Sequence, residues 1–288
     1  TLWSASSGLH SVLYGLNNVA GAEETRPWLR RRLLCMLYTL LTLAPSVSET
    51  QLLMAAYEMC GSFAVYRPGE RLEQALEHVY SSGEMPSSFG WKRAPGGHGR
   101  PSSLWMREPL IGIDELRAFA KEHQGDRGGK KLLCVSRSVT GIVASPLEAQ
   151  ASILLSVSRR KGGEGFDALE NNVRIDLSRS AKSIAGQNKA YADLLLLSKD
   201  QMHAVIVECQ GLSVHGVTGV SGEDAGRATA LQSMGYDVVL ITQAQLADRT
   251  QFSAVSRMLH ERLGYPYREK TPAMAAREAD LRSELFID

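Results

Sequence analysis

The chain has 288 residues, of which 44% are hydrophobic and 22% are charged. This composition is typical of a globular protein and excludes a collagen-like, fibrous or wholly disordered chain. Thirty-two basic and 31 acidic residues give a formal charge of +1, so any nucleic-acid surface must come from local clustering of basic side chains. Because single hydrophobic cores rarely grow beyond about 250–300 residues, we expect more than one structural unit.

Cysteine spacing and hydropathy give an indication of the cellular compartment. The four cysteines lie far apart and form no C-x-x-C pair, which argues against a zinc knuckle and against a small disulfide framework. The apolar run over residues 33–43 is about half as long as the roughly 20 residues that a membrane-spanning helix needs, so it predicts a buried helix. We therefore expect a cytoplasmic chain with no membrane partner.

Residues 1–130 predict a mainly helical N-terminal domain. Apolar side chains recur there at helical spacing in four segments, residues 24–43, 48–60, 68–82 and 113–122. Ser48 is placed to cap the second of these helices, and Gly61 is placed to end it. Residues 85–104 are rich in Pro, Gly and Ser and predict a loop. Whether this domain binds nucleic acid or a protein partner is left open by its sequence.

Residues 131–265 predict an α/β domain, and residues 266–288 predict a C-terminal helical tail. A helix begins after Ser145, which caps it, with Pro146 in the first turn and Glu148 at the third position. The predicted order is α-β-β-β-α-β-α, a mixed sheet flanked by helices. Its strands are expected over residues 172–177, 191–197, 204–208 and 236–242, and its later helices over residues 222–234 and 243–263.

Three acids and a glutamine form the candidate site. Asp193 lies in one predicted strand, while Glu208 and Gln210 lie at the end of the next and share a face, because strand side chains alternate. If these strands form a hairpin across residues 198–201, Asp193 lies opposite residue 206 and within one or two positions of Glu208. Adjacent carboxylates repel unless a cation lies between them. An oxygen-rich cluster of this kind suits Mg²⁺ or Mn²⁺ and does not suit zinc.

The order and spacing of these residues resemble the very-short-patch-repair-like branch of the PD-(D/E)XK nuclease superfamily. The resemblance covers roughly residues 140–264, and its fragments are Ser145-Pro-Leu-Glu148, Tyr191-Ala-Asp193, Val205-Ile-Val-Glu208-Cys-Gln-Gly211, His215, Asp224 with Arg227, and Leu231-Gln-Ser-Met-Gly235-Tyr-Asp-Val-Val-Leu-Ile-Thr242. It implies a restriction-endonuclease-like fold for this part of the chain.

The resemblance also implies a function, a divalent-metal-dependent endonuclease that hydrolyses phosphodiester bonds of DNA in defence or repair. Mg²⁺ or Mn²⁺ would be held by Asp193, Glu208 and the backbone carbonyl of Cys209, and Glu148 would hold a second ion or its water. His215 lies where related repair-type nucleases keep a histidine and is expected to act as a general acid or base. The expected phosphate contacts are basic side chains, Arg159, Arg160, Lys161 and Arg227.

Gln210 departs from the superfamily pattern, which has a lysine at this position. Glutamine can orient a water but supplies no positive charge, and losing such a donor commonly costs about 3 kcal/mol, or on the order of a hundredfold in rate. Lys189, four residues before Asp193, is the nearest lysine that could replace it. The departure favours an alternative hypothesis, an inactive, antitoxin-like regulator that keeps the nuclease fold and binds DNA. A plain interaction domain is a third hypothesis, and the sequence does not determine the oligomeric state.

Overall fold

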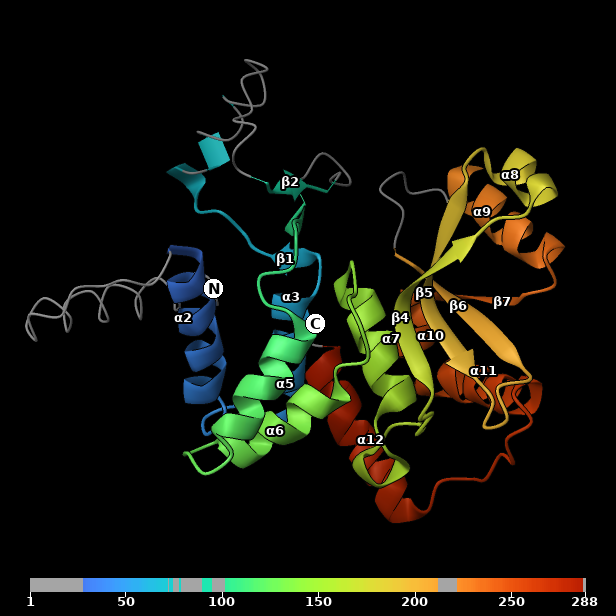
Figure 1. Cartoon of the computed structure of the whole chain (residues 1–288). Helices are drawn as coiled ribbons and strands as arrows, with labels where there is room; N and C mark the ends of the chain where they lie inside the picture. The colour runs from blue at the N-terminus through green and yellow to red at the C-terminus, as the bar shows by residue number, and fades with distance from the viewer. Residues whose placement is uncertain are drawn as a thin grey trace, which may run out of the picture.

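The computed structural model describes residues 28–71, 73–74, 78, 90–94, 102–211 and 222–286, without the side chains of residues 28–32 and 222–225. Within these ranges the chain is mixed α/β, with helices on one side of Figure 1 and a sheet flanked by helices on the other. No helix in the described part of the chain is both long and apolar enough to cross a lipid bilayer.

The N-terminal part consists of helices and one small sheet. Its elements are α2 (Trp28–Leu43), α3 (Glu49–Cys60), β1 (Phe63–Val65), β2 (Lys92–Arg93), β3 (Leu104–Met106), α5 (Ile113–Glu122) and α6 (Gly129–Ser138). Ser48 caps α3 as predicted: its hydroxyl accepts from the Gln51 N–H at 3.0 Å, and the Gln51 side chain accepts from the Ser48 N–H at 3.1 Å. The helix predicted over residues 68–82 lies mostly outside the described residues.

The small sheet corrects the prediction of a loop over residues 85–104. Its strands lie in the order β1-β3-β2 and pair antiparallel. Trp105 in β3 is buried, and the Arg93 guanidinium from β2 lies 5.1 Å from the centre of its ring. Strands of two or three residues are too short to give a period-two pattern, and this pairing joins residues far apart in sequence, so the local sequence could not indicate it.

The second part of the chain forms a four-stranded sheet with helices on both faces. Its elements are α7 (Pro146–Ser156), the 3₁₀ turn η1 (Arg159–Lys161), β4 (Leu169–Asp176), α8 (Arg179–Ala185), β5 (Lys189–Leu197), β6 (Ala204–Gln210), α9 (Gly222–Ser233), β7 (Asp237–Thr242), α10 (Gln243–Ala247), α11 (Arg249–Arg262) and α12 (Pro272–Leu285). The strand order is β4-β5-β6-β7, and only β6 and β7 are parallel. The predicted mixed sheet is therefore confirmed.

Two helical elements differ from the prediction. Helix α8 lies between the first two strands of the sheet and has seven residues, too few for a helical period to be recognised. Ser178 caps its start and Gly186, in the left-handed region, ends it. The single closing helix expected over residues 243–263 is two helices, because Asp248 leaves the helical conformation and its carboxylate accepts from the Gln251 N–H at 2.7 Å to cap α11.

The two faces of the sheet belong to different apolar layers. Val205 and Val207 of β6 pack in the layer that holds α7, α10 and α11, whereas Ile206 packs in the layer that holds α8 and α9. This alternation is expected of a central strand. The helices on each face are therefore held by alternate residues of the same strand.

Strands β4 and β5 exchange these two faces halfway along their length. In β5, Ala192 packs with α8 and α9, but Leu194, two residues on, packs with α7. Residues two apart normally share a face. The change occurs where Asn172 of β4, across from Asp193, has a left-handed backbone with φ of 53°. Asn tolerates this conformation better than most residues with a side chain, and it places Asp193 at the boundary between the two layers.

One apolar core joins the N-terminal helices to the sheet. The larger buried cluster runs without a break from Met36 in α2 through Leu154 in α7 to Leu285 in α12. The segment predicted as a tail is thus a packed helix that contacts α3 and η1. The core also crosses the expected boundary between residues 130 and 131.

The contact between η1 and α12 gives a testable prediction about Gly162. This glycine has φ of 100°, and a Cβ there would lie 2.5 Å from the Arg277 carbonyl oxygen. We expect Gly162→Ala to lower the free energy of unfolding by roughly 2 kcal/mol or more, measured by urea denaturation. Gly264 is the matched control, because its φ is 67° but nothing lies within 4 Å of its added Cβ. Equal losses at the two positions would show that crowding against α12 contributes nothing.

Candidate active site

The β5–β6 hairpin places Asp193 directly across from Glu208. Leu194 pairs with Val207, so the next position along each strand brings the two acids opposite each other. The register differs by two residues from the expected one, because the loop runs from residue 198 to 203 and is longer than the four residues expected. The prediction that these acids are neighbours is confirmed.

Backbone and side-chain hydrogen bonds fix Asp193. Its Oδ2 accepts from the Cys209 N–H at 2.8 Å, which ties the carboxylate to β6. Its carbonyl oxygen accepts from Asn171 Nδ2 at 3.2 Å. Asn171 is itself held by Thr140, whose hydroxyl donates to Asn171 Oδ1 at 2.6 Å, and by Ser152, whose hydroxyl accepts at 2.8 Å. These polar residues therefore connect α7 and the α6–α7 segment to the strand that carries Asp193.

Glu208 is buried and forms an ion pair on one side only. Its side chain is 4% exposed, and its Oε2 lies 2.5 Å from Arg227 Nη2 of α9. Its Oε1 has no hydrogen-bond partner among the residues that the structure describes. A buried carboxylate oxygen without a partner costs about 1–3 kcal/mol or more, which makes this atom a candidate contact for an ion or a water.

Glu148 caps its own helix. Its Oε2 accepts from the Ala144 N–H at 2.7 Å, and its Oε1 accepts from the Ser145 hydroxyl at 2.8 Å. The Ser145 hydroxyl accepts in turn from the Glu148 N–H at 3.2 Å, as the sequence predicts for a capping residue. Both carboxylate oxygens are therefore already hydrogen-bonded in a structural role, on the helix that covers the face opposite α9.

The three acids influence one another electrostatically. Burial raises the pKa of Glu148 to about 7, and the charge of Asp193 adds to this effect. Burial also raises the pKa of Glu208 to about 7, where Asp193 adds to the shift and Arg227 opposes it. The Cys209 thiol has a pKa well above its ordinary value, chiefly because it is buried and further because all three acids are charged. Asp193, Glu148 and Glu208 therefore each lie close enough to Cys209 to affect the pKa of its thiol.

These shifts predict a specific pH dependence of stability. Between the ordinary glutamate pKa of 4.5 and about 7, the unfolded chain releases protons that folded Glu148 and Glu208 retain. Rising pH therefore favours the unfolded chain in this window, and we expect the free energy of unfolding to fall. Urea midpoints at several pH values would measure the fall, which should be smaller in Glu208→Gln because glutamine does not ionise. A midpoint that rises with pH across this window in both proteins would contradict the assignment.

The remaining residues predicted for the site lie at different distances from it. Gln210 ends β6 on the same face as Glu208 and pairs with Thr242 of β7. Cys209 points to the opposite face and packs against the core, as expected. Lys189 begins β5, about 13 Å along the strand from Asp193, and its Nζ lies 5.3 Å from the centre of the Tyr191 ring. His215 lies outside the described residues.

The basic residues of η1 make contacts within the chain. Lys161 forms an ion pair with Glu49 of α3 and donates to Cys134 Sγ at 3.3 Å. Arg159 donates to the Arg268 carbonyl oxygen. Arg160, with Lys161, lines a cleft between α3, η1 and α12. Of the three predicted phosphate contacts that lie in η1, Arg159 and Lys161 therefore join η1 to other segments of the chain, and Arg160 lies between them.

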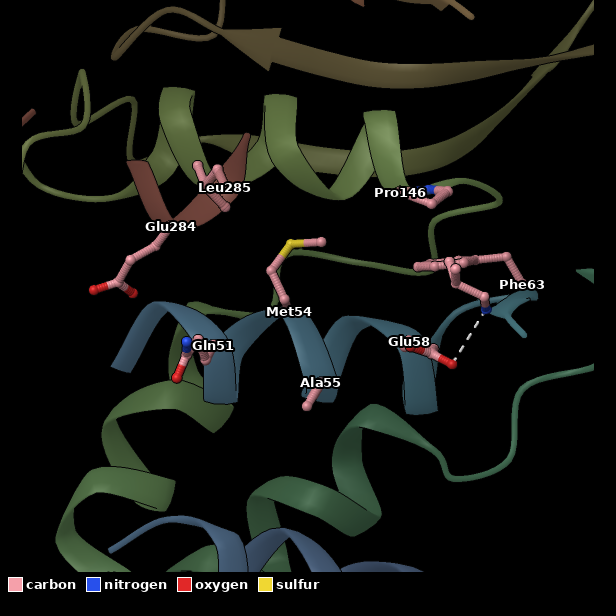
Figure 2. A pocket seen from close by; sticks show the side chains of 9 residues that line it. Gln51, Met54, Ala55, Glu58, Phe63, Pro146, Glu284 and Leu285 are labelled. Atoms are coloured by element: carbon pink, nitrogen blue, oxygen red, sulfur yellow. Dashed lines mark hydrogen bonds between the residues drawn. The ribbon is translucent and has the colours of Figure 1, made fainter. Parts of the chain in front are cut away.

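Two clefts among the described residues lie away from the acids. The cleft in Figure 2 has a volume of about 390 Å³ and lies between α3, the start of α7 and the end of α12. Its lining is largely apolar, with Met54, Phe63 and Leu285, and its Glu58 accepts from the Val65 N–H at 3.3 Å. Asp193, Glu208 and Glu148 line neither this cleft nor the second one beside η1.

A hard divalent cation fits two of the three acids. Among the described residues, no three His, Cys, Asp or Glu side chains are placed to hold one metal ion. Mg²⁺, however, usually takes only one or two protein carboxylates and keeps several waters. Asp193 and Glu208 supply such a pair, and the buried Glu208 Oε1 that lacks a partner is an oxygen that a cation would satisfy. Glu148 supplies charge nearby, but both its oxygens are hydrogen-bonded.

Comparisons with known proteins leave the chain without an assigned family. No family model, curated protein or solved structure matches it. The arrangement of Asp193, Glu208, Gln210 and Arg227 at the boundary of the two apolar layers is therefore the basis for inferring a function.

Proposed function

We propose that this chain is a divalent-metal-dependent DNA endonuclease of the restriction-endonuclease-like fold, acting in defence or repair. The observation that supports it most directly is the pair Asp193 and Glu208 on adjacent strands, of which Glu208 is buried and Asp193 is partly buried. Two adjacent carboxylates repel each other, and the Arg227 guanidinium compensates the charge of one of them, so the pair favours a further cation. The resemblance of the surrounding fragments to very-short-patch-repair-like nucleases supports the same reaction.

The ligands in this proposal are Asp193, Glu208 and the Cys209 carbonyl oxygen, and the ion is Mg²⁺ or Mn²⁺. Such an ion, when bound, lowers the pKa of a water and neutralises charge that develops on the phosphate. The protein holds the carboxylates ready: the Cys209 N–H orients Asp193, and burial keeps Glu208 from being satisfied by solvent. Glu148 adds negative charge that favours a cation at this position.

The other residues position water and phosphate. Gln210, on the Glu208 face of β6, can hydrogen-bond the attacking water through its amide oxygen. Arg227 is 28% exposed, so its guanidinium can reach a DNA phosphate from α9. His215 is proposed as the acid that protonates the leaving oxygen. Of the three basic residues of η1, Arg160 is proposed to contact a phosphate. Within the described residues, no hydrogen bond or ion pair of Arg160 competes with that contact.

The test is cleavage of supercoiled plasmid DNA by the full chain. We expect nicked or linear product with Mg²⁺ or Mn²⁺ and none when EDTA removes the ion, because the acids supply no charge stabilisation of their own. Adding Mg²⁺ in excess after EDTA should restore cleavage. Intact plasmid in every metal condition, with a folded protein, would contradict the proposed activity.

A second candidate function is supported by two observations, the Arg227–Glu208 ion pair and the glutamine at position 210. Arg227 pairs with a carboxylate that a metal ion would need, and Gln210 stands where the superfamily has a lysine. A regulator that binds DNA without cutting it would have these features. The same plasmid assay separates the two functions, because the regulator would bind a DNA duplex equally well with Mg²⁺ or EDTA and leave it intact.

A further inference from the structure

In the candidate metal site, the negative charge of Glu208 is already paired with the guanidinium of Arg227. Arg227 Nη2 lies 2.5 Å from Glu208 Oε2, in the range of a strong charge-assisted hydrogen bond. The same carboxylate keeps its other oxygen buried and without a partner among the described residues. Arg227 therefore compensates the charge of a carboxylate that the proposed function assigns to a divalent ion.

The backbone of α9 is held by residues other than Arg227. Ala230 and Leu231, in the next turn of α9, are fully buried between the sheet and α8 and hold the helix backbone. The Arg227 side chain is partly exposed, in contrast to Glu208. A change of rotamer at Arg227 that leaves this backbone in place would move the guanidinium away from the buried carboxylate and toward solvent.

We propose that Arg227 couples the binding of metal to the binding of DNA. Without a metal ion it pairs with Glu208; when a divalent cation takes Glu208, the guanidinium is released and contacts a phosphate. This inference rests on the proposed function, since it needs Asp193 and Glu208 to bind a cation. It adds a competition that neither the resemblance nor the cleavage reaction requires.

The competition has a thermodynamic consequence. The metal ion and Arg227 compete for the Glu208 carboxylate. Glu208 and a DNA phosphate in turn compete for the Arg227 guanidinium. Each ligand therefore removes the competitor of the other, so metal and DNA bind with positive cooperativity, and the coupling is reciprocal. Couplings of this kind commonly change affinity by about 5- to 150-fold.

The test measures DNA affinity by fluorescence anisotropy of a labelled duplex, with Ca²⁺ or with EDTA at constant ionic strength. Ca²⁺ prefers the same oxygen ligands and serves as a probe of occupancy. We expect Ca²⁺ to tighten binding by the wild type about tenfold and to have no such effect on Arg227→Gln. Arg257→Gln is the matched control, because Arg257 pairs with Glu269 on the surface. If Ca²⁺ tightens DNA binding equally in wild type and Arg227→Gln, the coupling role is wrong.

A second experiment measures the affinity for Mn²⁺ by calorimetry in the absence of DNA. Arg227→Gln should bind Mn²⁺ more tightly than the wild type, because the competing guanidinium is gone, and Arg227→Lys should fall between them. Weaker Mn²⁺ binding by a folded Arg227→Gln would overturn the competition. Asp193→Asn separates the two proposals: if it binds Mn²⁺ as the wild type does, the proposed metal site itself fails, whatever Arg227 does.

Discussion

Asp193→Asn should abolish metal-dependent DNA cleavage while leaving the fold intact. Asparagine keeps an oxygen that can accept from the Cys209 N–H, so the hydrogen bond between β5 and β6 is retained. It removes the negative charge opposite Glu208, and with it one of the two carboxylates available to a hard cation. We expect the cleavage rate to fall by at least on the order of a hundredfold, measured on supercoiled plasmid under single-turnover conditions.

The matched control for this variant is Asp176→Asn. Asp176 ends the neighbouring strand β4 and is exposed, where it pairs with Arg174. It should cut DNA at the wild-type rate. A second readout is the melting temperature: saturating Mg²⁺ should raise it in the wild type and in Asp176→Asn, but not in Asp193→Asn. Cleavage by Asp193→Asn at the parental rate would show that the site has been wrongly assigned.

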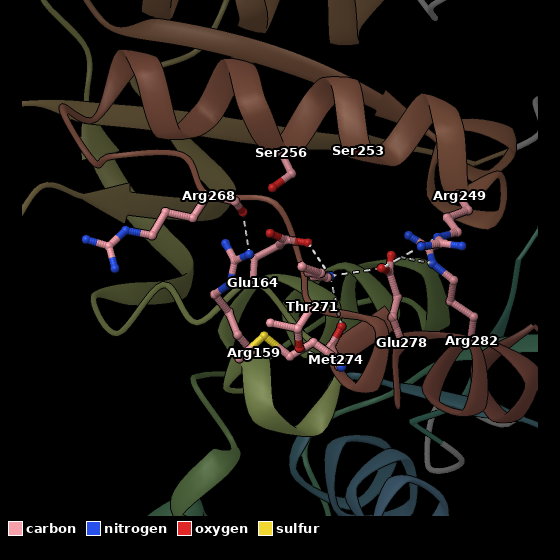
Figure 3. A network of polar contacts seen from close by, with 12 residues as sticks. Arg159, Glu164, Arg249, Ser253, Ser256, Arg268, Thr271, Met274, Glu278 and Arg282 are labelled. Carbon is pink, nitrogen blue, oxygen red and sulfur yellow. Dashed lines mark hydrogen bonds and ion pairs between the residues drawn. The ribbon is translucent and has the colours of Figure 1, made fainter. Parts of the chain in front are cut away.

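Glu278→Ala should be among the most destabilising single substitutions in the chain. Glu278 of α12 lies at the centre of the buried network in Figure 3, 3.0 Å from Arg282 Nε and 3.1 Å from Lys270 Nζ. Removing it leaves the buried Arg282 guanidinium without its carboxylate, and leaves Lys270 with Glu164 as its remaining carboxylate partner. Breaking a buried ion pair from one side costs about 3–5 kcal/mol, which urea denaturation would measure.

Glu269→Ala is the comparison for this loss. Glu269 lies in the segment between α11 and α12 and pairs with Arg257 at 3.2 Å, but both side chains are exposed. Exposed pairs contribute about 0–1 kcal/mol. The difference between the two variants in the free energy of unfolding therefore measures the effect of burying the ion pair, because both variants lose a glutamate. Similar losses in both would mean that α12 is not held by this network.

Local signals in the sequence were sufficient for the order of the main elements. Ser145 and Ser48 are capping residues with an acid or amide three positions later, and both begin helices as predicted. The aliphatic runs of β5, β6 and β7 likewise identify strands. The small sheet and α8 could not be predicted in this way, because they are shorter than the periods on which such predictions depend. The left-handed backbone of Asn172 leaves no periodic signal either.

The site was predictable in part. Strand alternation and a hairpin brought Asp193 close to Glu208, although the loop length shifted the register by two residues. The partnership of Arg227 with Glu208 was not predicted, since it depends on how α9 packs across the sheet. The polar residues behind Asp193 were also missed: Asn171, at an inward position of the alternating strand β4, was the available signal for a buried hydrogen-bond network.

The exchange of faces at Asn172 lets a carboxylate occupy the middle of a sheet without displacing an apolar side chain from either layer. Ala192 packs in one layer and Leu194 packs in the other, and position 193 between them contributes an apolar side chain to neither. Substitutions at position 193 can therefore change the charge at the candidate site at little cost in packing. A β-branched residue at position 172 would disfavour the positive φ there, and without the exchange of faces the Asp193 side chain would lie in one of the two apolar layers.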